Sequence, residues 1–131
     1  MATYNWRVLN GVFSDPNSWT NITTGQDPAT TPPGAVDAAN FVGASTGTIT
    51  GTGNVLSLAF NADGTWTLSG PTTSITAANI LVNDRTTIAN GGALILASTQ
   101  HTSGTELTIA QGTGSTGTLT GCSWWTRVLR E

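Results

Sequence analysis

The chain has 131 residues, of which only 8% are charged, and a formal net charge of −3 at pH 7. This low charge, together with β-branched residues throughout, separates the sequence from disordered chains, which combine low hydrophobicity with high net charge. Lysine is absent and the four cationic residues are arginines. The composition therefore excludes a strongly basic surface of the kind that binds nucleic acid.

The chain is expected to form one domain, residues 1–131, with an N-terminal cap over 1–41, repeating coils over 42–121 and an atypical tail over 122–131. No stretch approaches the roughly 20 apolar residues needed to cross a bilayer, so no membrane-spanning segment is predicted. Cys122 is the only cysteine, which excludes an intrachain disulfide and a cysteine-based metal site. No cofactor is predicted.

Two acidic residues of the N-terminal segment lie beside turn-forming residues. Asp15 precedes Pro16, and Asp37 follows the Pro33-Gly34 turn. Short carboxylates in such positions commonly accept hydrogen bonds from nearby backbone N–H groups, so both are predicted to hold local turns. Calcium binding at these acids is the weaker alternative, because the repeats lack a Gly-Gly-x-Gly-x-Asp pattern.

The middle of the chain alternates threonine or serine with one aliphatic or aromatic residue, as in Thr48-Ile49-Thr50-Gly51 and Thr118-Leu119-Thr120-Gly121. Alternation with a period of two predicts short β-strands that turn one face inward, and no run has the spacing of an amphipathic helix. The residues predicted to face inward are Ile49, Leu56, Leu58, Phe60, Trp66, Leu68, Ile75, Ile80, Val82, Ile88, Leu94, Leu96, Leu107, Ile109 and Leu119.

The predicted fold class is all-β. Short strands separated by turns fit either a β-solenoid or a β-sandwich. The similarity of successive runs and their single aliphatic inward residues favour a short β-solenoid, with the sandwich as the alternative. A provisional division into coils is 55–79, 80–105 and 106–121.

The N-terminal segment contains a recognisable phrase, which consists of Asn5-Trp6, Phe13-Ser14-Asp15-Pro16-Asn17-Ser18-Trp19 and Pro33-Gly34-Ala35-Val36-Asp37-Ala38-Ala39-Asn40-Phe41. It resembles the opening segment of bacterial β-helical surface proteins, especially autotransporter passenger and adhesin-like regions, and residues 104–120 are similar to a coil of the same class. The resemblance implies a right-handed parallel β-helix with a modified first coil as its cap, at the cell surface or outside the cell.

Four aromatic side chains of the N-terminal segment suit such a cap: Trp6, Phe13, Trp19 and Phe41. They offer large apolar surfaces where the open end of a solenoid must be covered. The alternative is that Trp6 and Trp19 form a platform that stacks on the sugar rings of a surface glycan.

The tail Cys122-Ser123-Trp124-Trp125-Thr126-Arg127-Val128-Leu129-Arg130-Glu131 departs from the family pattern. Trp124 and Val128 have helical spacing, so a short amphipathic turn is expected. The tail is interpreted as a cap, as an interface for self-association through Trp124 and Trp125, or as the tail of a truncated or out-of-frame gene.

No catalytic constellation is recognisable. His101, the single histidine, lies in a polar stretch without a Gly-x-Ser-x-Gly elbow or an acidic partner motif. The seven acids are scattered mainly over turns and are not clustered, as the paired carboxylates of glycosidases would be. The chain is therefore not expected to be an enzyme.

Three functions fit the sequence. The first is a structural or adhesive extracellular module that associates with itself. The second is a carbohydrate-binding β-helix that uses the tryptophans. The third is an ice-binding face, for which Thr-x-Thr pairs at 48 and 50, 65 and 67, and 118 and 120 would have to align, and this alignment requires a regular coil length.

Overall fold

The computed structural model describes residues 1–42, 46–60, 65–82, 85–89, 91–96, 103–104, 107–109, 118–120 and 128–130. Within these residues the chain consists of strands and one short 3-10 turn, η1 (Pro16–Ser18), which confirms the predicted all-β class. None of the helices in this described part is long and apolar enough to cross a membrane.

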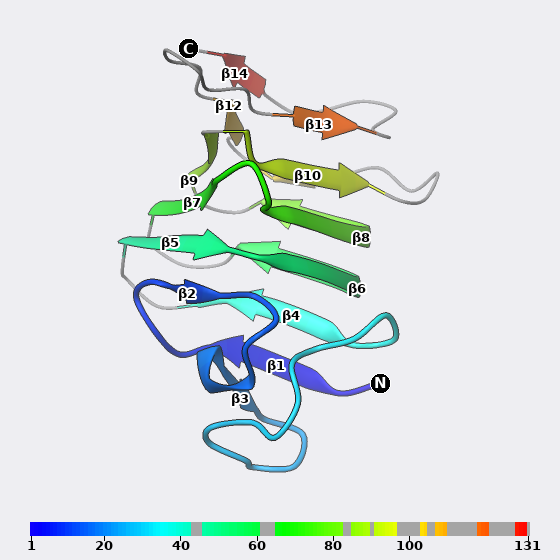
Figure 1. The fold of residues 1–131 in the computed structure, drawn as a ribbon. Helices are drawn as coiled ribbons and strands as arrows, with labels where there is room; N and C mark the ends of the chain where they lie inside the picture. The colour runs from blue at the N-terminus through cyan, green and yellow to red at the C-terminus, as the bar shows by residue number, and fades with distance from the viewer. Residues whose placement is uncertain are drawn as a thin grey trace.

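The described strands form two sheets (Figure 1). Sheet 1 contains, in spatial order, β13 (Thr118–Thr120), β10 (Ala93–Leu96), β8 (Ser74–Val82), β6 (Thr52–Phe60), β4 (Ala38–Phe41), β1 (Thr3–Trp6) and β3 (Trp19–Asn21), with β11 (Ser103–Gly104) also paired to β8. Sheet 2 contains, in spatial order, β14 (Val128–Arg130), β12 (Leu107–Ile109), β9 (Arg85–Ala89), β7 (Thr65–Ser69), β5 (Thr46–Thr50) and β2 (Gly11–Val12).

From β4 onward the chain visits the two sheets alternately, with β10 and β11 both contributing to sheet 1 before β12. We call one visit to sheet 1 and the following visit to sheet 2 a layer. The layers are stacked from the N-terminal end to the C-terminal end, as the colour gradient in Figure 1 shows. Neighbouring layers pair in parallel, and only β1 and β3 pair antiparallel among the described ladders. This pattern differs from the antiparallel sheets of the β-sandwich alternative.

The register shows how far apart in the sequence equivalent positions lie. In sheet 2, Thr48 pairs with Thr67, Thr67 with Thr87, and Thr87 with Thr108, so the step between layers is nearly constant along this ladder. In sheet 1 the step varies more, since Ala39 pairs with Leu58 but Leu94 pairs with the more distant Leu119. The provisional coil division was wrong, because Ser57 and Asn79 fall within its first coil yet pair on neighbouring strands.

The core lies on the alternate residues that the period-two pattern predicts. Equivalent apolar residues of successive layers pair directly, for example Ile49 with Leu68 and Phe41 with Phe60, so each layer packs on the next. Burial confirms the inward position of Ile49, Leu58, Phe60, Trp66, Leu68, Ile75, Ile80 and Leu94. The remaining inward predictions except Leu56 fall on side chains outside the described ones: Val82, Ile88, Leu96, Leu107, Ile109 and Leu119.

Leu56 was predicted to face inward, and this is wrong: its side chain is 37% exposed. The N–H groups of Leu56 and Ser57 both donate to the carbonyl oxygen of Asp37, so two residues of β6 oppose one residue of the preceding layer. The inward positions therefore shift from Val55 to Leu58, with two residues between them. The same shift from Ala77 to Ile80 in β8 keeps the two strands in register.

Two further expectations about the C-terminal half need correction. Residues Val128–Arg130 form a strand paired with β12, so the predicted helical turn is wrong for this part of the tail. Thr118 and Thr120 lie in sheet 1, paired with β10, whereas Thr48 and Thr67 lie in sheet 2. The three Thr-x-Thr pairs therefore do not form one array.

Candidate functional site

Four rings from different elements meet at the N-terminal end of the two sheets. Trp6 ends β1, Phe13 follows β2, Trp19 begins β3 and Phe41 ends β4. All four side chains are buried. Trp6 and Trp19 are cross-strand partners in the antiparallel β1–β3 ladder, which brings two distant tryptophans together.

The rings contact mainly edge to face. Trp19 lies edge-on to Trp6, Phe13 and Phe41 at centroid distances of 5.0, 4.9 and 5.4 Å, which is the geometry aromatic quadrupoles prefer. Phe41 then stacks on Phe60 of the next layer at 4.9 Å with an interplanar angle of 10°. The cluster is thus continuous with the core of the following layers.

The indole N–H groups of the buried tryptophans differ in their hydrogen bonding. The Trp19 Nε1–H donates to the backbone carbonyl of Phe13 at 2.7 Å, which fixes the orientation of the indole. Among the described residues, the buried Nε1 atoms of Trp6 and Trp66 have no hydrogen-bond partner. These two rings are therefore held by packing, at the cost of two unpaired donors.

Glycines make room for the rings. A Cβ at Gly53 would overlap with the ring of Phe13, and a Cβ at Gly47 would overlap with the carbonyl oxygen of Leu9 and lie 3.1 Å from the ring of Trp66. Gly47 is also the ladder partner of Trp66. A large ring in one layer is thus paired with a glycine in the preceding layer, and this complementarity was not visible in the sequence.

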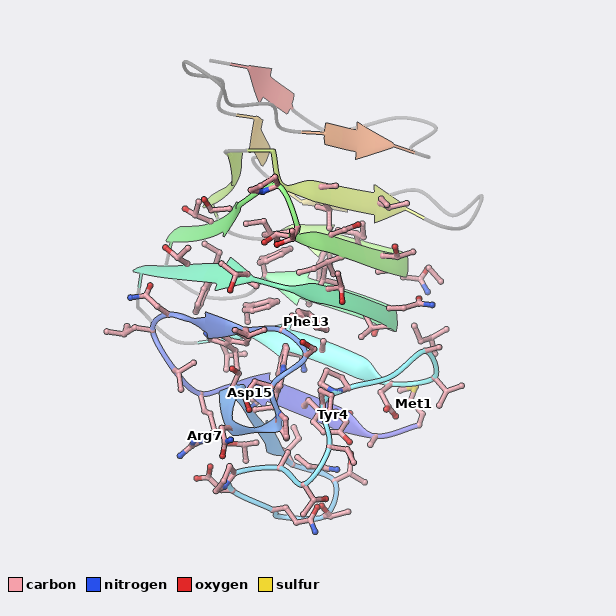
Figure 2. The ribbon with its side chains drawn as sticks, in the orientation of Figure 1. Met1, Tyr4, Arg7, Phe13 and Asp15 are labelled. Atoms are coloured by element: carbon pink, nitrogen blue, oxygen red, sulfur yellow. The ribbon has the colours of Figure 1, made fainter. Side chains whose placement is uncertain are left out.

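The loop between β2 and β3 is held by polar contacts. Asp15 caps η1, and its Oδ1 accepts from the backbone N–H and the side-chain amide of Asn17 at 2.9 and 3.0 Å. Arg7 donates to the carbonyl of Asn17 and forms an ion pair with Asp27. In Figure 2 the labelled Arg7 and Asp15 lie beside this loop, at the N-terminal end of the stack.

Asp37 joins three segments. Its Oδ1 accepts from the N–H of Ala2 at 2.7 Å, and its Oδ2 accepts from the N–H of Gly34 at 3.0 Å. Its carbonyl oxygen accepts the two N–H groups of β6 described above. The prediction that Asp15 and Asp37 satisfy local backbone donors is confirmed.

The alternative of a glycan platform at Trp6 and Trp19 has no exposed ring in this structure. Trp6 is 4% exposed and Trp19 is fully buried, so neither ring has a free face for a sugar. The physical reason is that the two rings supply the apolar packing of the N-terminal end, where they pack edge to face against each other. Trp124 and Trp125 lie outside the described residues.

The described residues contain no cluster of three or more His, Cys, Asp and Glu side chains able to hold a metal ion. Asp15, Asp27 and Asp37 are occupied by the local contacts above. The other acids and His101 lie outside the described residues.

Sequence reasoning missed one alignment. Thr87 and Thr108 continue the register position of Thr48 and Thr67 in sheet 2. The signal was present in the sequence as a nearly constant spacing between these threonines.

Comparison with protein-family models, with curated protein sequences and with solved structures found no match for this chain. The resemblance to bacterial β-helical surface proteins therefore stays a prediction.

Proposed function

We propose that the chain is a non-enzymatic structural or adhesive module of a bacterial surface protein, built as a short right-handed β-solenoid with an aromatic cap at its N-terminal end. The supporting observation is the succession of parallel pairings in two sheets, with both sheets visited in every layer. In such a stack each layer contacts mainly its neighbours, so the core is a row of repeated contacts and the outside is free to vary.

The N-terminal end supports the cap. A stack of parallel strands has unpaired N–H and C=O groups at its first strand, and these groups invite pairing with another chain. Here β3 pairs antiparallel with β1 at the edge of sheet 1, and Trp19 at its start packs on Trp6 and Phe13. The Arg7–Asp27 ion pair places charges on the loops beside this edge. The outer edge of β3 is occupied in turn by the following loop, because the N–H of Ala29 donates to the carbonyl oxygen of Trp19 and the N–H of Asn21 donates to that of Gln26.

Surface location can be tested with antibodies raised against the purified chain. They are expected to label intact cells of the source organism, whereas a control antibody against a cytosolic protein labels cells only after permeabilisation. Labelling that appears only after permeabilisation would refute the surface location.

Self-association through the tail belongs to the same proposal. Analytical ultracentrifugation of the full chain should show an oligomer that Trp125→Glu weakens and that the neighbouring control Ser123→Glu leaves unchanged. A monomeric parent chain would exclude this interface.

A further inference from the structure

The outer edge of β3, at the N-terminal end of sheet 1, is occupied by the chain's own backbone. The N–H of Ile22, directly after β3, donates to the carbonyl oxygen of Thr3 in β1 at 2.9 Å. Alternate residues of an antiparallel strand direct their backbone groups to opposite sides. Trp19 and Asn21 therefore direct their N–H and C=O groups away from β1, toward the end of the stack.

All four of these outward groups have a partner. The N–H of Trp19 donates to the carbonyl oxygen of Pro16 in η1, and its carbonyl oxygen accepts from the N–H of Ala29 at 2.9 Å. The N–H of Asn21 donates to the carbonyl oxygen of Gln26 at 2.9 Å, and its carbonyl oxygen accepts from the N–H of the same residue at 3.1 Å. Three of the four partners thus belong to residues 22–29, which we call the edge strap. In Figure 1 the loop that follows β3 lies at this end of the stack.

The edge strap buries little apolar surface. Residues 22–28 are all exposed, and Ala29 is the only buried side chain of the strap. The contacts of its side chains with the rest of the chain are polar and include the exposed ion pair of Asp27 with Arg7 and the hydrogen bond from Thr20 Oγ1 to Asp27 Oδ1 at 3.1 Å. Exposed ion pairs contribute little to stability. The strap is therefore the kind of segment that opens locally while the core stays folded.

The edge beneath the strap is self-complementary. Two copies of β3 placed antiparallel about a two-fold axis at Thr20 bring the N–H of Asn21 in each copy opposite the carbonyl oxygen of Trp19 in the other. The hydrogen bonds that both groups make to the strap are then replaced at once. The strand Trp-Thr-Asn contains no charged residue, and charge on an edge strand is what commonly opposes such pairing.

We propose that the edge strap is an autoinhibitory segment, which keeps a second copy of the chain from adding to sheet 1. When the strap opens, β3 of a second copy pairs antiparallel with the exposed edge, and sheet 1 continues from one copy into the other across the two-fold axis. This interface lies at the N-terminal end and is separate from the one proposed for the tail, residues 122–131.

A second copy fits this edge better than an unrelated extended peptide. A peptide that adds to a sheet edge gives up its backbone freedom in exchange for main-chain hydrogen bonds, and β3 offers a ladder of only three residues. In a second copy the same strand is already held in place by its pairing with β1 and by the buried ring of Trp19. Its pairing therefore costs less conformational entropy.

A strained turn in the strap tests the proposal. Gly25 has a φ of +76°, and a Cβ there would meet nothing within 4 Å, so Gly25→Val strains the backbone of the strap without a steric clash. Analytical ultracentrifugation should then show a dimer of the species that the parent chain forms. Gly70→Val is the matched control, because Gly70 also has a positive φ, +111°, but follows β7 in sheet 2. It should leave the sedimentation unchanged.

A second substitution locates the interface. Thr20→Glu, added to Gly25→Val, places two carboxylates opposite each other at the two-fold axis, and their repulsion should return the chain to the species of the parent. Hydrogen exchange on dilute protein, followed by NMR, shows whether the N–H of Asn21 has lost its protection. If Gly25→Val leaves it protected, Asp27→Arg, which opposes Arg7 with a like charge, takes its place as the opening substitution.

Two results overturn the proposal: unchanged sedimentation of a chain whose Asn21 N–H exchanges rapidly, and a dimer that persists after Thr20→Glu. Circular dichroism establishes that each variant is folded. The tail interface fails or stands independently, because Thr20→Glu should not affect association that Trp125→Glu weakens.

Discussion

The two sheets handle irregularity in different ways. Sheet 1 contains the extra residue at Leu56, the split of one layer into β10 and β11, and the antiparallel β3 at its edge. Sheet 2 contains parallel pairings only among its described strands, and the step along its central ladder is nearly constant. Variation in length is thus concentrated in one sheet and its connections, and the other sheet keeps an almost regular register.

The difference shows how a repeating fold tolerates an imperfect repeat. Aligned inward positions are preserved wherever a core residue must meet its equivalent in the next layer, as with Leu58 and Ile80 on the far side of the shift in sheet 1. An insertion shared by neighbouring strands costs little stability, because the inward-facing positions shift at the same place in both strands and stay aligned.

The largest effect is expected at the aromatic end of sheet 1. Trp19→Ala removes a fully buried ring that contacts three others and donates to the Phe13 carbonyl, so the free energy of unfolding should fall by about 3 to 5 kcal/mol. Urea denaturation followed by circular dichroism measures this loss. A loss below about 1 kcal/mol would mean that the cluster is not part of the cooperative core.

The next largest loss of stability is expected from substitution of Gly47 in sheet 2. Gly47→Ala places a methyl group against the Leu9 carbonyl and the Trp66 ring, and this overpacking should cost about 1 to 3 kcal/mol. Gly34→Ala is the control, because its Cβ would meet only Asp37 Oδ2 at an ordinary 3.7 Å. Equal stability of the two variants in urea would contradict the close approach of β5 to Trp66.

A smaller loss of stability is expected when the carboxylate of Asp37, which joins three segments, is replaced. Asp37→Asn keeps the shape of the side chain, but one of its two carboxylate oxygens becomes an NH₂ group that cannot accept from Ala2 or Gly34, so we expect a loss of about 1 to 2 kcal/mol. The thermal midpoint measures it, with Asp27→Asn at the exposed ion pair as the comparison. A larger drop of the thermal midpoint in Asp27→Asn than in Asp37→Asn would show that the exposed ion pair, and not Asp37, contributes more to stability.

The smallest effect is expected at Leu56. Leu56→Ser changes an exposed side chain and should alter the free energy of unfolding by no more than about 0.5 kcal/mol. Leu58→Ala, two positions later and buried, should cost about 2 to 5 kcal/mol. If Leu56→Ser lowers the free energy of unfolding in urea more than Leu58→Ala does, the shift of the inward positions in β6 is placed wrongly.

Much of the fold could be predicted from the alternation of threonine with apolar residues. The pattern identified Trp66 and Leu68 as inward and excluded helices between the strands, because a period of two is a local property of the strand. The phase shift at Leu56 could not be predicted, since it depends on the Asp37 carbonyl of a different layer. Register is likewise a relation between strands, so equal-looking Thr-x-Thr pairs at 67 and 118 fell in different sheets.

The role of the candidate site residues likewise depends on contacts between strands, which the sequence does not show. Aromatic residues in the N-terminal segment predicted either a cap or a sugar platform, and only their burial distinguishes the two. A buried ring and an exposed ring have the same sequence signature, because the neighbours that cover Trp19 come from β1, β4 and the segment after β2.

Engineered disulfides test the register of sheet 2 most directly. In a Cys122→Ser background, Thr48→Cys combined with Thr67→Cys places two thiols on paired residues about 4.8 Å apart at Cα, within the range that a disulfide spans. Thr50→Cys combined with Thr67→Cys offsets them by two residues, to about 8 Å, beyond that range. Mild oxidation should crosslink the first pair rapidly and the second pair little; a faster crosslink in the offset pair would contradict the parallel register on which the stacked layers depend.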